Sequence, residues 1–301
     1  MNPVQHDAPP LDCVIVGAGP AGLTAAIYLQ RFGRRIQLID AGGGRALKIS
    51  RSRNCPGFPA GIAGAELIER LRQQLQSFGG AVTSGQVAEL SRRADGLFGL
   101  QLLNQDARLL SRTVLLCTGV QDRLPALPGI AELCAADRLR QCPICDGYEH
   151  RGQKIGVLGG SEHAAREAEF LRDLGADVVA LTLEESDGSS PVQQIAFDDR
   201  AVLVTMGDGS TQRFDVLYAA LGVTPRVTLA RQLDARLDAT GNIVVDAHCR
   251  SSVEGLYAAG DVVSALDQIA VAFGHSAIAA TALHNDLRAQ RRKTERRGSP
   301  A

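Results

Sequence analysis

Residues 11–22 have the sequence LDCVIVGAGPAG, in which a short apolar run leads into three glycines spaced G-x-G-x-x-G. An apolar run of this kind is typical of a strand buried in a parallel sheet. Apolar residues recur at helical spacing over 23–32, and Gly33 follows where a glycine commonly ends a helix. Strand, glycine turn and helix in this order predict a nucleotide-binding α/β unit.

Each glycine of this turn meets a separate physical need. Gly17 allows the tight turn, Gly19 lets the backbone approach a pyrophosphate, and Gly22 lets the helix pack closely on the strand. Pro20 and Ala21 complete the turn. The start of the helix offers N–H groups and a partial positive charge, which together favour bound phosphates.

An acidic residue completes this first nucleotide site. Residues 36–39 predict the second strand, and Asp40 ends it about twenty residues after the turn. A carboxylate at this place can accept hydrogen bonds from the ribose of a bound adenosine. The four elements together indicate a nucleotide site more strongly than the glycines alone.

A second unit of the same kind begins at residue 154. Its expected elements are a strand, a turn, a helix closed by Gly175 and a further strand, at 154–158, 159–161, 162–174 and 178–183. Two such openings predict an α/β protein with two Rossmann-like, three-layer domains rather than one large domain. Later patterns predict two short strands, a helix and a frayed basic tail, at 201–205, 214–221, 277–287 and 288–301.

Composition narrows the class of protein. The chain has 301 residues, 45% of them hydrophobic and 22% charged, which is ordinary for a globular protein. A net charge of −1 gives no general attraction to nucleic acid or to an anionic membrane. No apolar run approaches the roughly 20 residues that span a bilayer, and residues 1–10 do not resemble a signal peptide. We therefore expect a cytoplasmic protein that binds neither nucleic acid nor membrane.

Only two of the seven cysteines form a close pair, Cys142 and Cys145. A C-x-x-C pair beside a βαβ unit indicates redox chemistry, whereas a zinc site would need a second pair, so we expect no metal. A metal-binding or purely structural pair is the alternative. The remaining cysteines occur singly and are expected to pack as small apolar residues, namely Cys13, Cys55, Cys117, Cys134 and Cys249.

Four further segments resemble the low-molecular-weight thioredoxin reductase family, and the resemblance covers most of the chain. They are RNCPGFP at 53–59, LCTG at 116–119, AGD at 259–261 and the region of Gln268. The resemblance implies bound FAD, with contacts from Asn54, Thr118, Gly119, Gly260, Asp261, Gln268 and Ile269. It also implies an FAD domain split into 1–123 and 239–301, with a nucleotide-type domain carrying the cysteine pair at 124–238.

The same resemblance assigns roles around the cysteine pair. Cys145 would lie against the flavin and form the charge-transfer thiolate, and Cys142 would exchange with the substrate. Asp146 would act as general acid and base, a role that needs a carboxylate within reach of the sulfur and a raised pKa; its alternative is a turn residue before Gly147. His275 follows the Gln268 segment, and a structural role is favoured over a flavin contact.

The second unit departs from the family at its nucleotide site. Ser161 stands where the second glycine should let a pyrophosphate approach, and Glu162 adds negative charge. Glu184 and Glu185 replace a His-Arg-Arg segment that clamps the 2′-phosphate of NADPH in the family. Too few residues separate Glu185 from the strand at 201 for the usual helix-plus-strand repeat. NADPH is therefore expected to bind poorly.

We expect a homodimeric, FAD-dependent thiol–disulfide oxidoreductase that serves a thioredoxin-like protein or a small dithiol or disulfide. Its electrons could come from NADH, through Glu184, or from a protein donor such as ferredoxin. The chain could also oxidise a dithiol and pass electrons to oxygen, because residues 142–149 also resemble the C-x-x-C-x-G-Tyr-Glu segment of microbial dithiol oxidases. A non-catalytic redox-sensing flavoprotein and an NADH-dependent flavoenzyme with non-thiol substrates are the rival classes.

Overall fold

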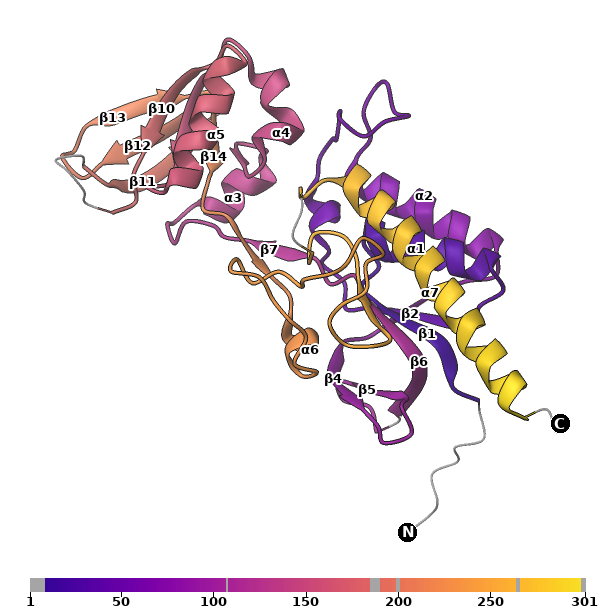
Figure 1. The fold of residues 1–301 in the computed structure, drawn as a ribbon. Coiled ribbons are helices and arrows are strands. Elements are labelled where there is room, and N and C mark those ends of the chain that lie inside the picture. Colours follow the sequence, from indigo (N-terminus) through magenta and orange to yellow (C-terminus); the bar gives the residue numbers. More distant parts are fainter. Residues whose placement is uncertain (1–8, 107, 185–189, 199–200, 264–265, 299–301) are drawn as a thin grey trace. The chain divides into compact units, whose positions relative to one another are not determined.

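A computed structural model describes residues 9–106, 108–184, 190–198, 201–263 and 266–298 (Figure 1). Contacts divide the chain into two compact units. The first unit comprises 1–51, 62–120 and 225–301, and the second comprises 52–61 and 121–224. Among the described residues no helix is long and apolar enough to cross a membrane.

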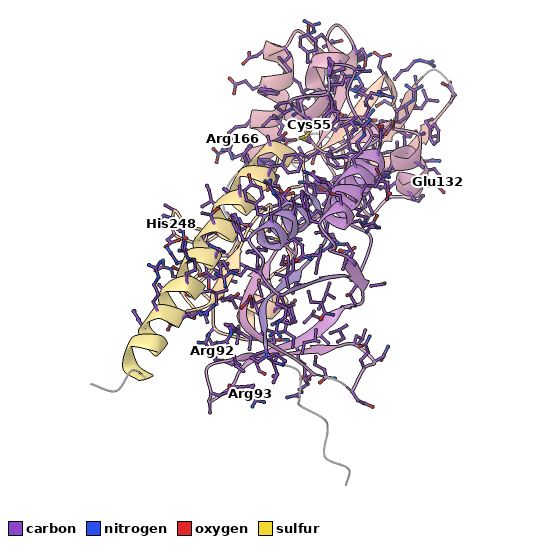
Figure 2. All side chains as sticks on the ribbon, turned by 90° about the vertical axis from the view of Figure 1, so that its right-hand side faces the viewer. Cys55, Arg92, Arg93, Glu132, Arg166 and His248 are labelled. Atoms are coloured by element: carbon purple, nitrogen blue, oxygen red, sulfur yellow. A yellow bond between two sulfur atoms is a disulfide. The ribbon has the colours of Figure 1, made fainter. Side chains whose placement is uncertain are left out.

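The first unit contains a seven-stranded sheet in the order β3-β2-β1-β6-β5-β4, with β16 also paired to β6. The strands are β1 (Leu11–Val16), β2 (Ile36–Asp40), β3 (Val82–Ser84), β4 (Val87–Arg92), β5 (Phe98–Leu102), β6 (Arg108–Leu116) and β16 (Leu256–Ala258). Strands β1, β2, β3, β6 and β16 pair in parallel, while β4 and β5 continue the sheet antiparallel. Arg92 lies at the antiparallel edge of this sheet (Figure 2), and its guanidinium is 4.5 Å from the centroid of the buried Phe98 ring.

Helices pack on the apolar faces of this sheet. They are η1 (Arg45–Lys48), α1 (Pro20–Arg31), α2 (Gly64–Ser77), α6 (Thr228–Arg231) and α7 (Ile269–Gly298). Helices α1 and α7 lie side by side and bury Leu23, Leu29 and Leu283 in one core (Figure 1). Helix α7 continues through 288–298, the residues for which the sequence predicts a frayed tail. Fraying of this helix end stays a prediction. The last three residues of that tail lie outside the described residues.

The second unit contains a parallel sheet and an antiparallel one. The parallel sheet has the order β10-β9-β14-β8, and the antiparallel sheet has the order β11-β12-β13. These strands are β8 (Leu139–Arg140), β9 (Lys154–Leu158), β10 (Asp177–Leu181), β11 (Val192–Phe197), β12 (Val202–Met206), β13 (Thr211–Phe214) and β14 (Val216–Ala219). The helices are α3 (Ile130–Ala135), α4 (Pro143–Asp146), η2 (Gly147–His150) and α5 (Glu162–Asp173). Both units are thus of the Rossmann-like α/β type that the two glycine turns predict.

The chain passes between the units near β7 (Val120–Asp122) and β15 (Val223–Pro225), which form a two-stranded sheet. The compact units change at 120/121 and 224/225, whereas the sequence-based boundaries stand at 123/124 and 238/239. Residues after Pro225 belong to the first unit because Leu229 and Ala230 are buried in its core.

Candidate functional site

The first glycine turn has the geometry that its spacing predicts. Gly17 has φ +102°, and a Cβ there would lie 2.3 Å from the Cys117 carbonyl oxygen. A Cβ at Gly22 would lie 1.8 Å from the Gly17 carbonyl oxygen, so helix and strand meet more closely than any side chain permits. A Cβ at Gly19 would meet nothing within 4 Å. The turn therefore excludes side chains at Gly17 and Gly22, where backbone atoms pack closely, and leaves space at Gly19, where a phosphate would approach.

The helix start and the acidic residue complete this open cradle. Gly19 caps α1 with no side-chain hydrogen bond, and the first turn of α1 carries no acidic residue that would repel a phosphate. Asp40 accepts hydrogen bonds from the backbone N–H of Ala18 at 2.9 Å and of Gly42 at 3.1 Å. These residues fit the pyrophosphate and ribose of a dinucleotide such as FAD.

Other predicted flavin contacts of the first unit come from three segments, of which those at Gly260 and Thr118 lie beside the turn. Gly260 has φ +80°, and its Cβ would lie 2.9 Å from Ala21 Cβ. Thr118 donates a hydrogen bond of 2.7 Å to the Arg226 carbonyl oxygen, and Gly119 follows with φ +64°. Gln268 and Ile269 lie at the start of α7, where the Gln268 carbonyl oxygen accepts the Ala272 N–H at 2.9 Å.

The sequence analysis missed a cation, Arg45, that pairs with Asp261, another of the predicted flavin contacts. Arg45 Nη1 lies 3.2 Å from an oxygen of Asp261 and 3.2 Å from an oxygen of Asp267. The side chain thereby ties η1 to the end of β16 and to the segment before α7. In the sequence, Arg45 is marked only by its place directly after three consecutive glycines, residues 42–44.

Asn54, expected to contact flavin, belongs to the second unit. Its amide nitrogen donates a hydrogen bond of 3.3 Å to the Ile144 carbonyl oxygen, and its amide oxygen accepts one of 3.1 Å from Ser52. The segment 52–61 is thus held to α4, the short helix that carries the cysteine pair.

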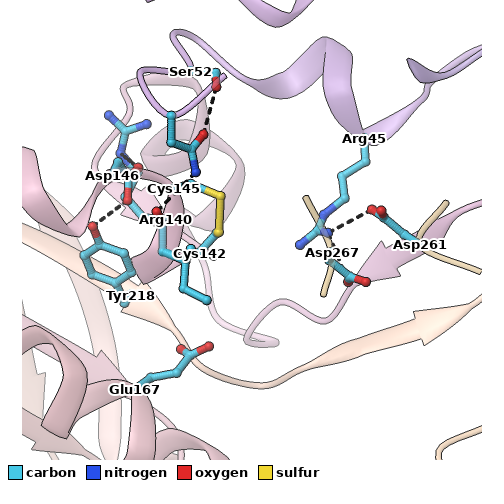
Figure 3. The surroundings of a disulfide bond; sticks show 12 residues. Arg45, Ser52, Arg140, Cys142, Cys145, Asp146, Glu167, Tyr218, Asp261 and Asp267 are labelled. Carbon is cyan, nitrogen blue, oxygen red and sulfur yellow. Dashed lines mark hydrogen bonds and ion pairs between the residues drawn. A yellow bond between two sulfur atoms is a disulfide. The ribbon is translucent and has the colours of Figure 1, made fainter. Parts of the chain in front are cut away.

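Cys142 and Cys145 are joined in a disulfide bond, with Cα atoms 5.3 Å apart (Figure 3). The pair flanks the start of α4, and the Cys145 N–H donates to the Cys142 carbonyl oxygen at 3.0 Å. The next residue, Gly147, starts η2 and packs closely on α5. A Cβ at Gly147 would lie only 3.0 Å from the Leu171 side chain of α5. The disulfide is thus presented at one end of a short, tightly supported helix.

A buried acid follows the disulfide. Tyr218 donates a hydrogen bond of 2.6 Å to one oxygen of Asp146, and Arg140 Nε lies 3.5 Å from the other oxygen (Figure 3). Burial raises the pKa of the Asp146 carboxyl, while the Tyr218 hydrogen bond and the Arg140 charge act in the opposite direction. Sequence reasoning found Asp146 but not Tyr218, whose only signal is one hydroxyl in the apolar run of β14.

A second, half-buried carboxylate, Glu167, lies among the residues around the disulfide (Figure 3). Burial raises the pKa of Glu167 to about 7. One oxygen lies 3.1 Å from His163 Nε2, and the other is buried with no hydrogen-bond partner among the described residues. Sequence reasoning missed Glu167 because a lone Glu in a charged helix carries no signal.

The second glycine turn differs from the first. A Cβ at Gly159 would lie 2.9 Å from the Ala220 carbonyl oxygen, so this glycine is required as Gly17 is. Ser161 caps α5, and its hydroxyl oxygen accepts the Ala164 N–H at 3.3 Å. Glu162 follows in the first turn of the helix. The exposed Glu184 lies beyond β10, and Glu185 lies outside the described residues.

The other singled-out residues have local partners. The single cysteines are buried, apart from half-buried Cys134, and burial raises the pKa of Cys13 to about 12. The His275 carbonyl oxygen accepts from the Cys249 thiol at 3.5 Å, and the ring Nδ1 is buried without a hydrogen-bond partner among the described residues. Within the described ranges, no group of three or more His, Cys, Asp or Glu side chains could hold a metal ion.

A dinucleotide cradle in one α/β unit, with a C-x-x-C disulfide and a buried acid in the other, defines a flavin-type disulfide oxidoreductase. Known proteins similar to this chain agree with that class. The profile of the family described as "Pyridine nucleotide-disulphide oxidoreductase" matches residues 11–187 and 188–276. Thioredoxin reductase of Treponema pallidum (strain Nichols) is 30% identical over 302 residues, which cover 90% of this chain and 95% of the relative.

Two crystal structures are similar over almost the whole chain. HlmI aligns with a TM-score of 0.87 and 28% identity over 99% of this chain and 100% of its own. Thioredoxin reductase from Streptococcus pyogenes MGAS5005 aligns with a TM-score of 0.84 and 28% identity over 93% and 98%. The chain belongs to the pyridine nucleotide-disulphide oxidoreductase family, within its low-molecular-weight thioredoxin reductase group. It is an FAD-dependent enzyme acting on a sulfur group.

Proposed function

We propose that the enzyme passes electrons between FAD and the Cys142–Cys145 pair, and between that pair and an external disulfide or dithiol. The observation that carries this proposal is the disulfide itself, which is followed directly by the buried Asp146 and its donor Tyr218. Cys145 is assigned to the flavin side and Cys142 to the substrate side, with Asp146 as proton donor and acceptor.

The first unit supplies the residues proposed to hold FAD. The turn from Gly17 to Gly22 would take the pyrophosphate, and Asp40 the adenosine ribose. Further contacts are assigned to Thr118, Gly119, Gly260, Asp261, Gln268 and Ile269, with Asn54 from the second unit. When bound, FAD would supply transfer of an electron pair to or from the cysteine pair.

NADPH is proposed to be a poor electron donor. At the second turn the Ser161 hydroxyl already accepts an N–H at the start of α5, so its side chain occupies the place where a pyrophosphate would approach. Glu162 adds a negative charge at the same helix start. NADH, bound through Glu184, and a ferredoxin-like protein are the remaining donors of electrons.

Two substrate classes fit the exposed side of the cysteine pair. A thioredoxin-like protein is supported by relatives named thioredoxin reductase. A small dithiol, oxidised with oxygen as the final acceptor, is supported by the resemblance of residues 142–149 to dithiol oxidases. Ile144 and Tyr148 of this segment are 49% and 60% exposed, so apolar surface lies beside the sulfur atoms. A homodimer and a cytoplasmic location stay predictions.

Anaerobic titration of the flavin absorbance tests the direction of electron flow. NADH, NADPH and dithiothreitol are added in turn, and the reagent that bleaches the flavin identifies the half-reaction. We expect bleaching by the dithiol and little by NADPH; fast reduction by NADPH would contradict the proposed donor preference.

Substitution of Cys142 separates this enzyme from a non-catalytic flavoprotein. Cys142→Ser should abolish thiol–disulfide exchange while leaving bound yellow flavin, because Cys142 belongs to the second unit and the cradle to the first. Cys134→Ser, at a half-buried single cysteine, is the matched control. Exchange that survives in Cys142→Ser would show that the pair is not the active site.

A further inference from the structure

The charged groups around Asp146 come from every element packed near it. Arg140 ends β8 and also lies 3.2 Å from Asp137. The remaining titratable groups are Glu149 and His150 of η2, Arg53 beside Glu149, Glu167 and His163 of α5, and Tyr218 of β14. Tyr218 donates directly to a carboxylate oxygen of Asp146, at 2.6 Å.

Tyr218 is itself held in place. Its side chain is fully buried on β14, and the ring of His150 contacts it edge-on with centroids 6.1 Å apart. Burial and the nearby Asp146 carboxyl raise the pKa of the phenol, so the hydroxyl keeps its proton and remains a donor. A fixed donor on a strand defines where one oxygen of Asp146 lies.

We infer that Tyr218 is a positioning residue for the reaction at the cysteine pair: it orients the Asp146 carboxyl so that Asp146 delivers a proton to the departing sulfur. The inference rests on the proposed function. It extends that function to a side chain 72 residues away in sequence, contributed by a strand of the second unit.

The step balances in protons and electrons. In the reduced pair, the Cys142 thiolate attacks one sulfur of an external disulfide, and the external S–S bond breaks. The electron pair of that bond leaves on the distal sulfur, which takes a proton from Asp146. The Cys145 thiol then attacks the mixed disulfide and gives up its proton, so the Cys142–Cys145 bond closes and the second external sulfur leaves as a thiol carrying that proton. Two electrons pass from the cysteine pair to the external disulfide.

Two external disulfides that differ in the basicity of their leaving thiolate test whether Asp146 delivers a proton. An alkyl disulfide releases a basic thiolate that needs a proton, whereas 5,5′-dithiobis(2-nitrobenzoate) releases a weakly basic aryl thiolate that departs without one. Holoenzyme reduced with dithiothreitol, freed of excess reagent, is mixed anaerobically with each disulfide. Tyr218→Phe should slow exchange with hydroxyethyl disulfide by roughly tenfold and leave exchange with the aryl disulfide unchanged.

The pH dependence of the exchange rate with the alkyl disulfide provides a second test. The acid form of Asp146 is the active one, so exchange with the alkyl disulfide falls as the pH rises through its pKa. A donated hydrogen bond stabilises the carboxylate, and its loss raises the pKa. The descending limb should therefore move to higher pH in Tyr218→Phe. A Tyr218 that only supports packing would leave that limb in place.

Matched variants keep the test decisive. Tyr257 donates a bond of the same 2.6 Å length to Asp286 in the first unit, so Tyr257→Phe should change neither rate. Asp146→Asn should lose alkyl exchange, and adding Tyr218→Phe to it should cost nothing further, because Tyr218 acts through Asp146. Equal slowing with both disulfides, or additive losses in the double variant, would overturn the role of Tyr218. Exchange surviving in Cys142→Ser would instead overturn the proposed function.

Discussion

The turns at Gly17 and Gly159 follow the same βαβ plan, yet they differ in the residue at their third position. Both first glycines are required by backbone contacts, at 2.3 Å for Gly17 and 2.9 Å for Gly159. The turns diverge two residues later, where Gly19 leaves open space and Ser161 caps its own helix. Two turns with the same backbone plan thus differ at one position, where the first leaves open space and the second carries a hydrogen-bonded side chain.

The residues at the end of the second strand of each βαβ unit also differ. Asp40 at the end of β2 accepts the backbone N–H of Ala18 in the first turn and that of Gly42 in the loop after β2. Thr182, just after β10 in the second unit, instead exchanges hydrogen bonds with the backbone of Glu184, at 2.7 and 3.2 Å. The first turn is therefore braced by a carboxylate, whereas the residues described after β10 hold only their own backbone.

Gly22→Ala should have the largest effect on this comparison. A Cβ there would lie 1.8 Å from the Gly17 carbonyl oxygen, so helix α1 must shift away from β1. We expect loss of bound flavin and a fall of about 1–3 kcal/mol in the free energy of unfolding. Gly160→Ala is the matched control, because its Cβ would meet only Thr182 Oγ1, at 3.9 Å.

Denaturant unfolding and the flavin absorbance of the purified protein measure both effects. Gly160→Ala should keep flavin and unfold as the wild type does. If Gly22→Ala retained stoichiometric flavin at wild-type stability, the close packing at the first turn would not matter for the cofactor.

Exchanging the residues that distinguish the turns gives a smaller effect. Gly19→Ser should fold normally, since its Cβ has open space, but should weaken FAD binding by roughly tenfold or more because the side chain meets the pyrophosphate. Ser161→Gly should cost only a few tenths of a kcal/mol, as glycine is a tolerated N-cap.

Fluorescence titration of flavin-free protein with FAD measures the first variant, and thermal unfolding the second. Equal FAD affinity in Gly19→Ser and the wild type would show that the pyrophosphate does not approach at Gly19. Reduction of Ser161→Gly by NADPH, together with no such reduction of the wild type, would show that this serine alone blocks the second turn.

The two βαβ openings were predictable because their signals are local. Strands β1 and β9 coincide with the apolar runs in the sequence, and contacts within each unit require glycine at the first position of each turn. Strand β11 was missed since its polar sequence VQQIAF becomes a strand only by pairing with β12. Helix α7 extends past Leu287 through residues that carry no apolar period.

The site residues that sequence reasoning missed depend on distant partners. Tyr218 lies 72 residues from Asp146, and Arg45 lies 216 residues from Asp261. Neither residue belongs to a motif, so only the folded chain reveals the pairings. Cys142, Cys145 and Asp146 could be predicted because C-x-x-C-D-G is contiguous.

The smallest expected effect comes from a difference between the two helices that follow the turns. Glu167 in α5 occupies the position of buried Ala25 in α1, each eight residues after the first glycine. Burial raises the pKa of Glu167 from 4.5 to about 7. Between these values the unfolded chain is ionised at this residue and the folded chain is not. Stability that is present below pH 4.5 is therefore lost as the pH rises through 7.

Glu167→Gln should remove this dependence. The free energy of unfolding of the wild type should fall relative to the variant by on the order of 1 kcal/mol between about pH 5 and about pH 8, a modest value because the carboxyl is partly exposed. The exposed Glu169→Gln on the same helix should follow the wild type at every pH. Parallel pH curves for the wild type and Glu167→Gln would show that Glu167 ionises as freely in the fold as in the unfolded chain. Divergent curves would instead show that the second helix buries a carboxylic acid where the first helix buries only a methyl group.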